Sequence, residues 1–148
     1  MAHDVFVSYS SKDKAIADAI VSALENNQIR CWYAPRDIQP SEDWGQAITN
    51  AIEASKVFLI IFSASANRSQ RVLDELNLAI TQQAIILPFR IENLEPFGAM
   101  KLHLSSRHWL DAFPEAALPA AMGSLSGLLR PLCGLSAVPS GAILPREE

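Results

Sequence analysis

The sequence predicts an α/β fold in which a parallel sheet of five strands is covered by helices on both faces. The first observation is the segment 57–62, VFLIIF, an uninterrupted apolar run rich in β-branched and aromatic residues. A strand buried on one face would alternate, so a continuous run is typical of a strand covered on both faces. A short helix would also give such a run, but the run is brief and serines flank it, so we favour a central strand. The second observation is that strand-like and amphipathic helical segments alternate along the chain, as in a doubly wound sheet.

The expected elements follow one another in the order that this fold requires. Strands are expected at residues 4–9, 30–33, 57–62, 84–89 and 108–110. Helices are expected from the capping pattern at 10–13 to about residue 26, and over residues 44–54, 70–81 and 114–129. Ser41 is expected to cap the second helix. Residues 34–43, 63–69 and 91–107 are expected to lack regular structure, and the Gly-, Pro- and Ser-rich residues 134–148 to form a linker or tail.

Composition narrows the class of protein. A chain of 148 residues with 49% hydrophobic residues is expected to form one domain with a real core. The net charge of −4, without a basic stripe, argues against nucleic-acid binding. Cys31 and Cys133 lie far apart with no CxxC pair, so each is expected to be a small buried residue. No segment has the length and composition of a signal peptide or a membrane span, so a cytoplasmic protein without a membrane partner is expected.

The sequence lacks the motifs of several common binding and catalytic sites. No glycine-rich dinucleotide fingerprint follows a strand, and no P-loop occurs. The three histidines are scattered without metal-ligand spacing, and no serine or cysteine occupies a nucleophile elbow. Ser63 stands after the central strand, where a phospho-receiver domain of this size would need a carboxylate. The sequence therefore predicts neither a metal site nor a bound cofactor.

Glu75 is the acidic residue that the predicted fold places best for chemistry. In open α/β sheets ligands bind outside the carboxyl ends of the strands, where residues 63–69 and the start of the helix 70–81 are expected. At about 100° per residue, Glu75 lies about 90° from the centre of the buried helix face, while Asp74 points to solvent. A carboxylate at the rim of a cleft is partly desolvated and can meet a ligand. The alternative is that Glu75 only pairs with Arg71, four residues earlier, or caps a neighbouring loop.

Three segments resemble the Toll/interleukin-1 receptor (TIR) domain family, in its bacterial branch. Residues 4–10, DVFVSYS, are similar to the family's first box. Residues 30–38, RCWYAPRDI, are similar to its second strand and BB loop, and residues 69–76, SQRVLDEL, to the segment that holds the catalytic glutamate of its enzymatic members. The resemblance assigns residues 1–133 to a TIR domain. The family fold, a flavodoxin-like five-stranded parallel sheet with surrounding helices, agrees with the fold predicted from the pattern.

The resemblance implies an activity and a set of site residues. Many bacterial TIR domains cleave NAD between nicotinamide and ribose, so NAD is expected as the substrate, with no cofactor. Glu75 matches the catalytic glutamate, and Tyr9 and Ser10 match positions that line the site. Many enzymatic members have an aromatic residue where this chain has Arg71, so base stacking would come from another residue, for which Trp44 is the best candidate.

The BB loop, from Ala34 to Asp43, is the segment that in the family closes over the site or meets the next subunit. Arg36 in this loop is a candidate for the substrate's pyrophosphate; the alternatives are a solvated loop arginine or a partner of Asp37. The expected function is an NAD glycohydrolase or cyclase activated by association with other TIR domains as a homo-oligomer, serving as the effector module of a bacterial antiphage defence protein. The alternatives are a TIR–TIR interaction module without catalysis and a bacterial effector that mimics host TIR adaptors.

Overall fold

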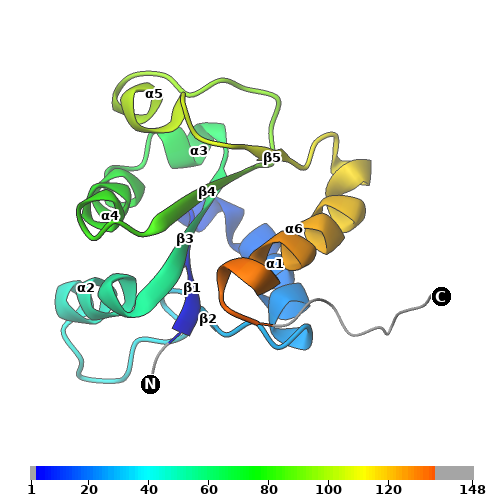
Figure 1. Cartoon of the computed structure of the whole chain (residues 1–148). Helices are drawn as coiled ribbons and strands as arrows, with labels where there is room; N and C mark the ends of the chain where they lie inside the picture. The colour runs from blue at the N-terminus through cyan, green and yellow to red at the C-terminus, as the bar shows by residue number, and fades with distance from the viewer. Residues whose placement is uncertain (1–2, 136–148) are drawn as a thin grey trace.

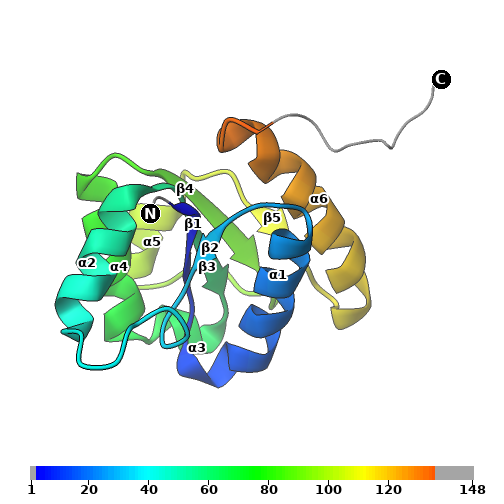
Figure 2. The same ribbon diagram turned by 90° about the horizontal axis from the view of Figure 1, so that it is seen from below.

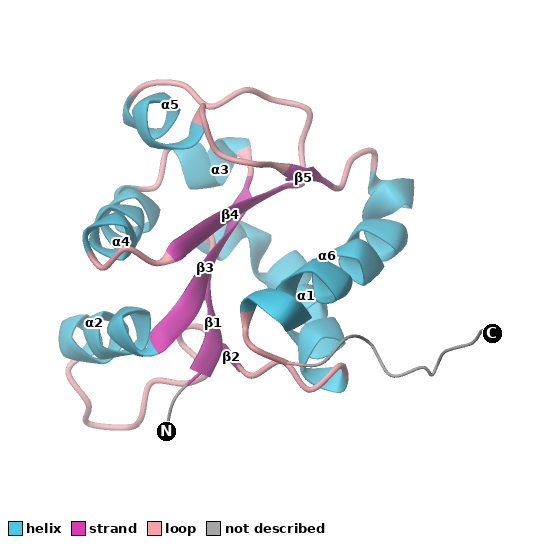
Figure 3. Ribbon diagram, in the orientation of Figure 1, coloured by secondary structure: helices cyan, strands magenta, loops and turns pink. Residues whose placement is uncertain are grey.

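Five parallel strands form a single sheet in the order β2-β1-β3-β4-β5 in the computed structural model, which describes residues 3–135. The strands are β1 (His3–Ser8), β2 (Cys31–Trp32), β3 (Ser55–Phe62), β4 (Ile85–Arg90) and β5 (Leu110–Asp111). In register, Ser8 at the end of β1 lies beside Ile60 of β3. Figure 3 shows the twisted sheet running through the middle of the molecule. The predicted α/β fold with five parallel strands is confirmed.

Helices cover both faces of the sheet. One face carries α2 (Trp44–Ala54), α4 (Gln70–Thr81) and α5 (Ala99–Leu104), and the other carries α1 (Lys14–Asn26) and α6 (Leu118–Leu132) (Figure 1). The shorter elements are α3 (Ala64–Asn67) and the 3₁₀ turns η1 (Ser11–Asp13) and η2 (Glu115–Ala117). In both Figure 1 and Figure 2, α2 and α4 lie side by side. None of the helices within residues 3–135 combines the length and the hydropathy that spanning a bilayer requires.

The central strand β3 is buried from both sides, as its apolar run predicts. Alternate residues Val57, Leu59 and Ile61 belong to the core under α1 and α6. The residues between them, Phe58, Ile60 and Phe62, belong to the core under α2 and α4. Each of the six side chains is at most 1% exposed. Apolar and polar residues therefore do not alternate in this segment because the strand is buried on both faces.

The structure corrects several expected boundaries. Ser41 does not cap α2, because it adopts a positive φ of 66° and the side chain of Asp43 accepts the hydrogen bond from the N–H of Gln46 instead. Residues 91–107 are not wholly irregular, since α5 forms there, and α3 forms within 63–69. The last strand begins at Leu110 rather than at residue 108, and the last helix begins and ends later than predicted. These short elements carry little periodic signal and depend on tertiary contacts.

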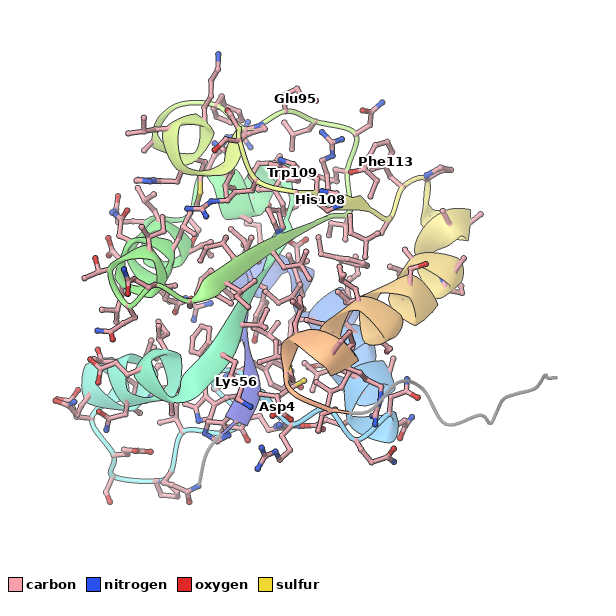
Figure 4. All side chains as sticks on the ribbon, in the orientation of Figure 1. Asp4, Lys56, Glu95, His108, Trp109 and Phe113 are labelled. Carbon is pink, nitrogen blue, oxygen red and sulfur yellow. The ribbon has the colours of Figure 1, made fainter. Side chains whose placement is uncertain are left out.

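Polar contacts fix two opposite corners of the sheet (Figure 4). Asp4, only 1% exposed, accepts hydrogen bonds from the backbone and side chain of Arg30, which holds β2 against β1. At the far edge, Arg90 pairs with Asp111 through two hydrogen bonds, at 2.8 and 3.0 Å, and packs against the ring of Trp109. Of the predicted tail, residues 134 and 135 complete the end of α6, and the rest lies outside the described residues.

Candidate active site

Glu75 lies where β1 ends against α4. The side chain of Ser69 caps α4 by accepting a hydrogen bond from the N–H of Val72, which sets the helix that carries Glu75. Ser8 is the last residue of β1, and its hydroxyl donates a hydrogen bond of 2.7 Å to Oε1 of Glu75. Glu75 is only 6% exposed and Ser8 1%, so Glu75 is more deeply buried than its position in the sequence predicts.

The surroundings of Glu75 act on its protonation in opposite directions. Burial raises the pKa of the carboxyl group above its usual value of 4.5, because a charge is costly to remove from water. The hydrogen bond from Ser8 and the positive charge of Arg71 lower the pKa, and the neighbouring Asp74 raises it. Burial is the largest of these effects, so the net shift of the pKa is upward. A buried acid with a shifted pKa at the end of a strand is a candidate for catalysis.

A cleft of about 220 Å³ opens beside Glu75, between α2 and α4. Apolar and charged side chains share its walls. Its lining residues are Gly45, Ile48, Thr49, Ile52, Arg71, Asp74, Glu75 and Leu78. Within residues 3–135, no group of three or more His, Cys, Asp or Glu side chains is placed to hold a metal ion. The arrangement therefore offers a desolvated carboxylate beside an open, partly apolar cleft.

The profile of the TIR domain family matches residues 5–124, which is most of the chain and includes all of the sheet except the first two residues of β1. The chain belongs to the TIR domain family. No curated protein matches its sequence significantly.

Solved structures show the same fold at low sequence identity. The TIR domain of the Toll-related receptor TRR-2 from Hydra magnipapillata is 21% identical over 87% of this chain and 99% of its own, with a TM-score of 0.72. The TIR domains of the activated Roq1 resistosome are 18% identical over 92% of this chain and 86% of theirs, with a TM-score of 0.59. The CMP N-glycosidase BcmB of Clostridium botulinum is 16% identical over 82% of this chain and 97% of its own, with a TM-score of 0.58.

Arg71 occupies the wall of the TIR cleft one helical turn before Glu75. Its Nη2 donates a hydrogen bond of 2.7 Å to the backbone oxygen of Tyr9, and its Nε lies 3.7 Å from Oε2 of Glu75. The latter distance is too long for a good hydrogen bond, whereas the hydroxyl of Ser8 is 2.7 Å from the carboxylate. Glu75 therefore does more than pair with Arg71, which was one of the alternatives from the sequence.

Tyr9 and Ser10 follow β1 close to the site, but both are buried and neither lines the cleft. Tyr9 is 3% exposed and donates its hydroxyl to the backbone oxygen of Ala34, at the start of the BB loop. Ser10 accepts a hydrogen bond from the N–H of Lys12 and so caps η1. The contact of Tyr9 with the cleft runs through its backbone oxygen, which holds Arg71. A substrate contact by either residue stays a prediction.

The two other predicted binding residues lie outside the walls of the cleft. Arg36 donates two hydrogen bonds of 2.8 Å to the carboxylate of Glu25, contacts Asp37 and packs over the ring of Tyr33. These contacts hold the BB loop against α1, so a pyrophosphate would have to displace them. Trp44 is 52% exposed beside Gly45 of the cleft, which leaves its indole free to reach a base. Both assignments stay predictions.

Ser8 is a residue of the site that was not predicted from the sequence. A strand alternates its side chains, so the apolar Val7 and Tyr9 face the core under α1, while Phe6 and Ser8 face α2 and α4. The signal was a polar residue at the carboxyl end of the first strand, two residues after Phe6 and on the same buried face. A buried hydroxyl needs a partner, and Glu75 is that partner.

Replacing Ser8 by alanine is expected to raise the pKa of Glu75 further. The hydrogen bond from Ser8 favours the ionised form of the carboxyl group, so its loss favours the protonated form. The measurement is the titration of the Glu75 carboxyl group by protein NMR, with Ser55→Ala at the start of β3 as the control. A pKa that does not change would mean that Ser8 does not tune Glu75.

Proposed function

We propose that this TIR domain cleaves NAD at the bond between nicotinamide and ribose, with Glu75 as the catalytic carboxylate. The observation that carries the proposal is the buried Glu75, held by Ser8 at 2.7 Å and facing a cleft. The family supports it, as does a structural neighbour that is named as a CMP N-glycosidase. The role in antiphage defence stays a prediction.

The chemistry needs one carboxylate. The leaving group of NAD is a cationic pyridinium that departs as neutral nicotinamide, so no general acid is required, in contrast to hydrolysis of ordinary glycosides. Ionised Glu75 accepts a hydrogen bond from a ribose hydroxyl and stabilises the positive charge that grows on the sugar. Water then attacks the anomeric carbon to give ADP-ribose, or a nucleophile within the substrate attacks it to give a cyclic product, and one proton is released to solvent in either case. Ser8 fixes the carboxylate, which reduces the reorganisation that the transition state would otherwise require.

The size of the cleft favours activity in an assembly. Small-molecule sites usually enclose about 300–1,000 Å³, whereas this cleft holds about 220 Å³ and is open to solvent. NAD is larger than the ligands that such a volume encloses. A second copy of the domain would supply the missing walls, and in the sequence the BB loop leads into the exposed Trp44, which precedes the lining residue Gly45. We therefore propose that self-association completes the site.

Incubation of NAD with concentrated protein, followed by chromatography, tests the proposal. Release of nicotinamide supports it, and the second product distinguishes linear from cyclic ADP-ribose. The rate per molecule is expected to rise with protein concentration from sub-micromolar to high micromolar, because association completes the cleft. A flat rate per molecule would contradict the role of assembly while leaving the catalytic role of Glu75 intact.

A binding module without catalysis is the second candidate function. The observation that favours it is Arg71, which stands where many enzymatic members of the family carry an aromatic residue. One structural neighbour, the Roq1 resistosome, is an assembly that contains TIR domains. Absence of NAD turnover, even when the protein is forced to cluster on a carrier, would favour this candidate.

A further inference from the structure

The charges on the walls of the cleft are unequal. Asp74 and Glu75 are acids, Arg71 is the one cation among the described lining residues, and the others are uncharged. A nucleotide brings negative phosphates into a space that already holds two carboxylates. Repulsion from these carboxylates would oppose its entry unless a nearby cation offsets it. Arg71 is in place to do so.

Arg71 has hydrogen-bonding capacity to spare. Its Nη2 is held by the backbone oxygen of Tyr9, yet its side chain is 39% exposed, and within residues 3–135 its Nη1 makes no hydrogen bond. Arg90, by comparison, is an arginine whose contacts stabilise the fold. Its side chain is 14% exposed and bonds to Asp111, Glu95 and a backbone oxygen. Its guanidinium also lies over the rings of Trp109 and Phe113, which are labelled in Figure 4. Arg71 is held by the backbone oxygen and ring of Tyr9 and lies 3.7 Å from Glu75, but its Nη1 is left to meet a ligand.

The order of groups on α4 matches the order of groups on a nucleotide. Arg71 and Glu75 stand one helical turn apart on the same wall of the cleft. A ribose that presents its hydroxyls to Glu75 carries its 5′-phosphate on the same sugar. A guanidinium fits a phosphate with paired N–H groups, and the tether to Tyr9 reduces the entropy lost on binding.

We infer that Arg71 binds the phosphate attached to the ribose that Glu75 holds, so that the cleft selects nucleotides over nucleosides. The inference rests on the proposed function for the position of the ribose. A cation beside a pyridinium ring is repelled, which directs the nicotinamide toward another wall.

Nicotinamide mononucleotide and nicotinamide riboside test the inference, because they differ only in the phosphate. Their dissociation constants follow from titrations observed by protein NMR. The wild type is expected to bind the mononucleotide roughly tenfold more tightly than the riboside. Arg71→Leu is expected to remove this preference by weakening the mononucleotide alone, and Arg71→Lys to retain part of it. The matched control is Arg68→Leu, which removes an exposed charge that packs near Phe97, outside the cleft.

The results separate the inference from the proposed function. Equal binding of the two compounds by the wild type, or of neither, overturns the role of Arg71, as does an equal loss for both in a folded Arg71→Leu protein. If Arg71→Leu does not fold, the role of Arg71 is tested by the preference of the wild type for the mononucleotide and by its reduction in Arg71→Lys. Preferential binding of the mononucleotide without cleavage of it or of NAD would retain Arg71 and reject the catalytic proposal. Cleavage of both compounds with the same KM would support the catalytic proposal and overturn the role of Arg71.

Discussion

Replacing Glu75 by glutamine is expected to lower the rate of NAD cleavage by at least about 10³-fold, because one group stabilises the charge in the transition state. Glutamine has the same shape, and its oxygen can still accept the hydrogen bond from Ser8. The substitution thus removes the negative charge and leaves the packing of α4 in place. The measurement is nicotinamide release at equal protein concentration. The matched control is Glu53→Gln, which removes an exposed charge on α2, outside the cleft.

The same substitution is expected to stabilise the fold at neutral pH. Burial raises the pKa of Glu75, so folding favours its protonated form, and the ionised carboxylate costs stability above the raised pKa. This cost fades as the pH falls toward 4.5, the usual value for glutamate, where the group is protonated in the folded state. A difference of about 1 kcal/mol would shift Tm by roughly 4 °C in a domain of this size. A lower Tm for Glu75→Gln at neutral pH would show instead that Arg71 and Ser8 more than compensate the charge.

The fold was predictable from the sequence because its strongest signals are periodic and local. The run 57–62 specifies a strand buried on two faces, and the predicted bounds of α2 and α4 agree with those in the structure. The segments whose structure was predicted wrongly are short. Ser41 and Asp43 are both good capping residues, and which of them caps α2 depends on a backbone turn with positive φ that composition does not specify.

The site was predictable only in part, because side-chain partners are set by tertiary structure. The position of Glu75 on its helix pointed to a cleft, but its burial depends on how closely β1 approaches α4. Arg36 has no feature in sequence that indicates Glu25, a residue of the preceding helix, as its partner. Ser8 could have been found from the two-residue period of a strand, because it is a polar residue at the carboxyl end of β1 on the same buried face as Phe6.

Ile60→Ala and Ile61→Ala are each expected to cost about 2–5 kcal/mol in the free energy of unfolding, because each deletes buried methyl groups and leaves a cavity. The two residues are consecutive and both 0% exposed, yet they belong to the cores on opposite faces of the sheet. Urea denaturation measures the loss. Ile85→Ala, at a position 44% exposed on the neighbouring strand, is the control and is expected to cost less than about 1.5 kcal/mol.

The two core variants are expected to differ in activity at a temperature where both are folded. Ile60 pairs in register with Ser8 and shares its face of the sheet, so a cavity there lies under the hydrogen bond to Glu75. Ile61 faces α1 and α6, with the sheet between it and the cleft. NAD cleavage should therefore fall more for Ile60→Ala than for Ile61→Ala at similar losses of stability. Equal activities would show that the geometry of Ser8 and Glu75 tolerates a shift of the sheet beneath them.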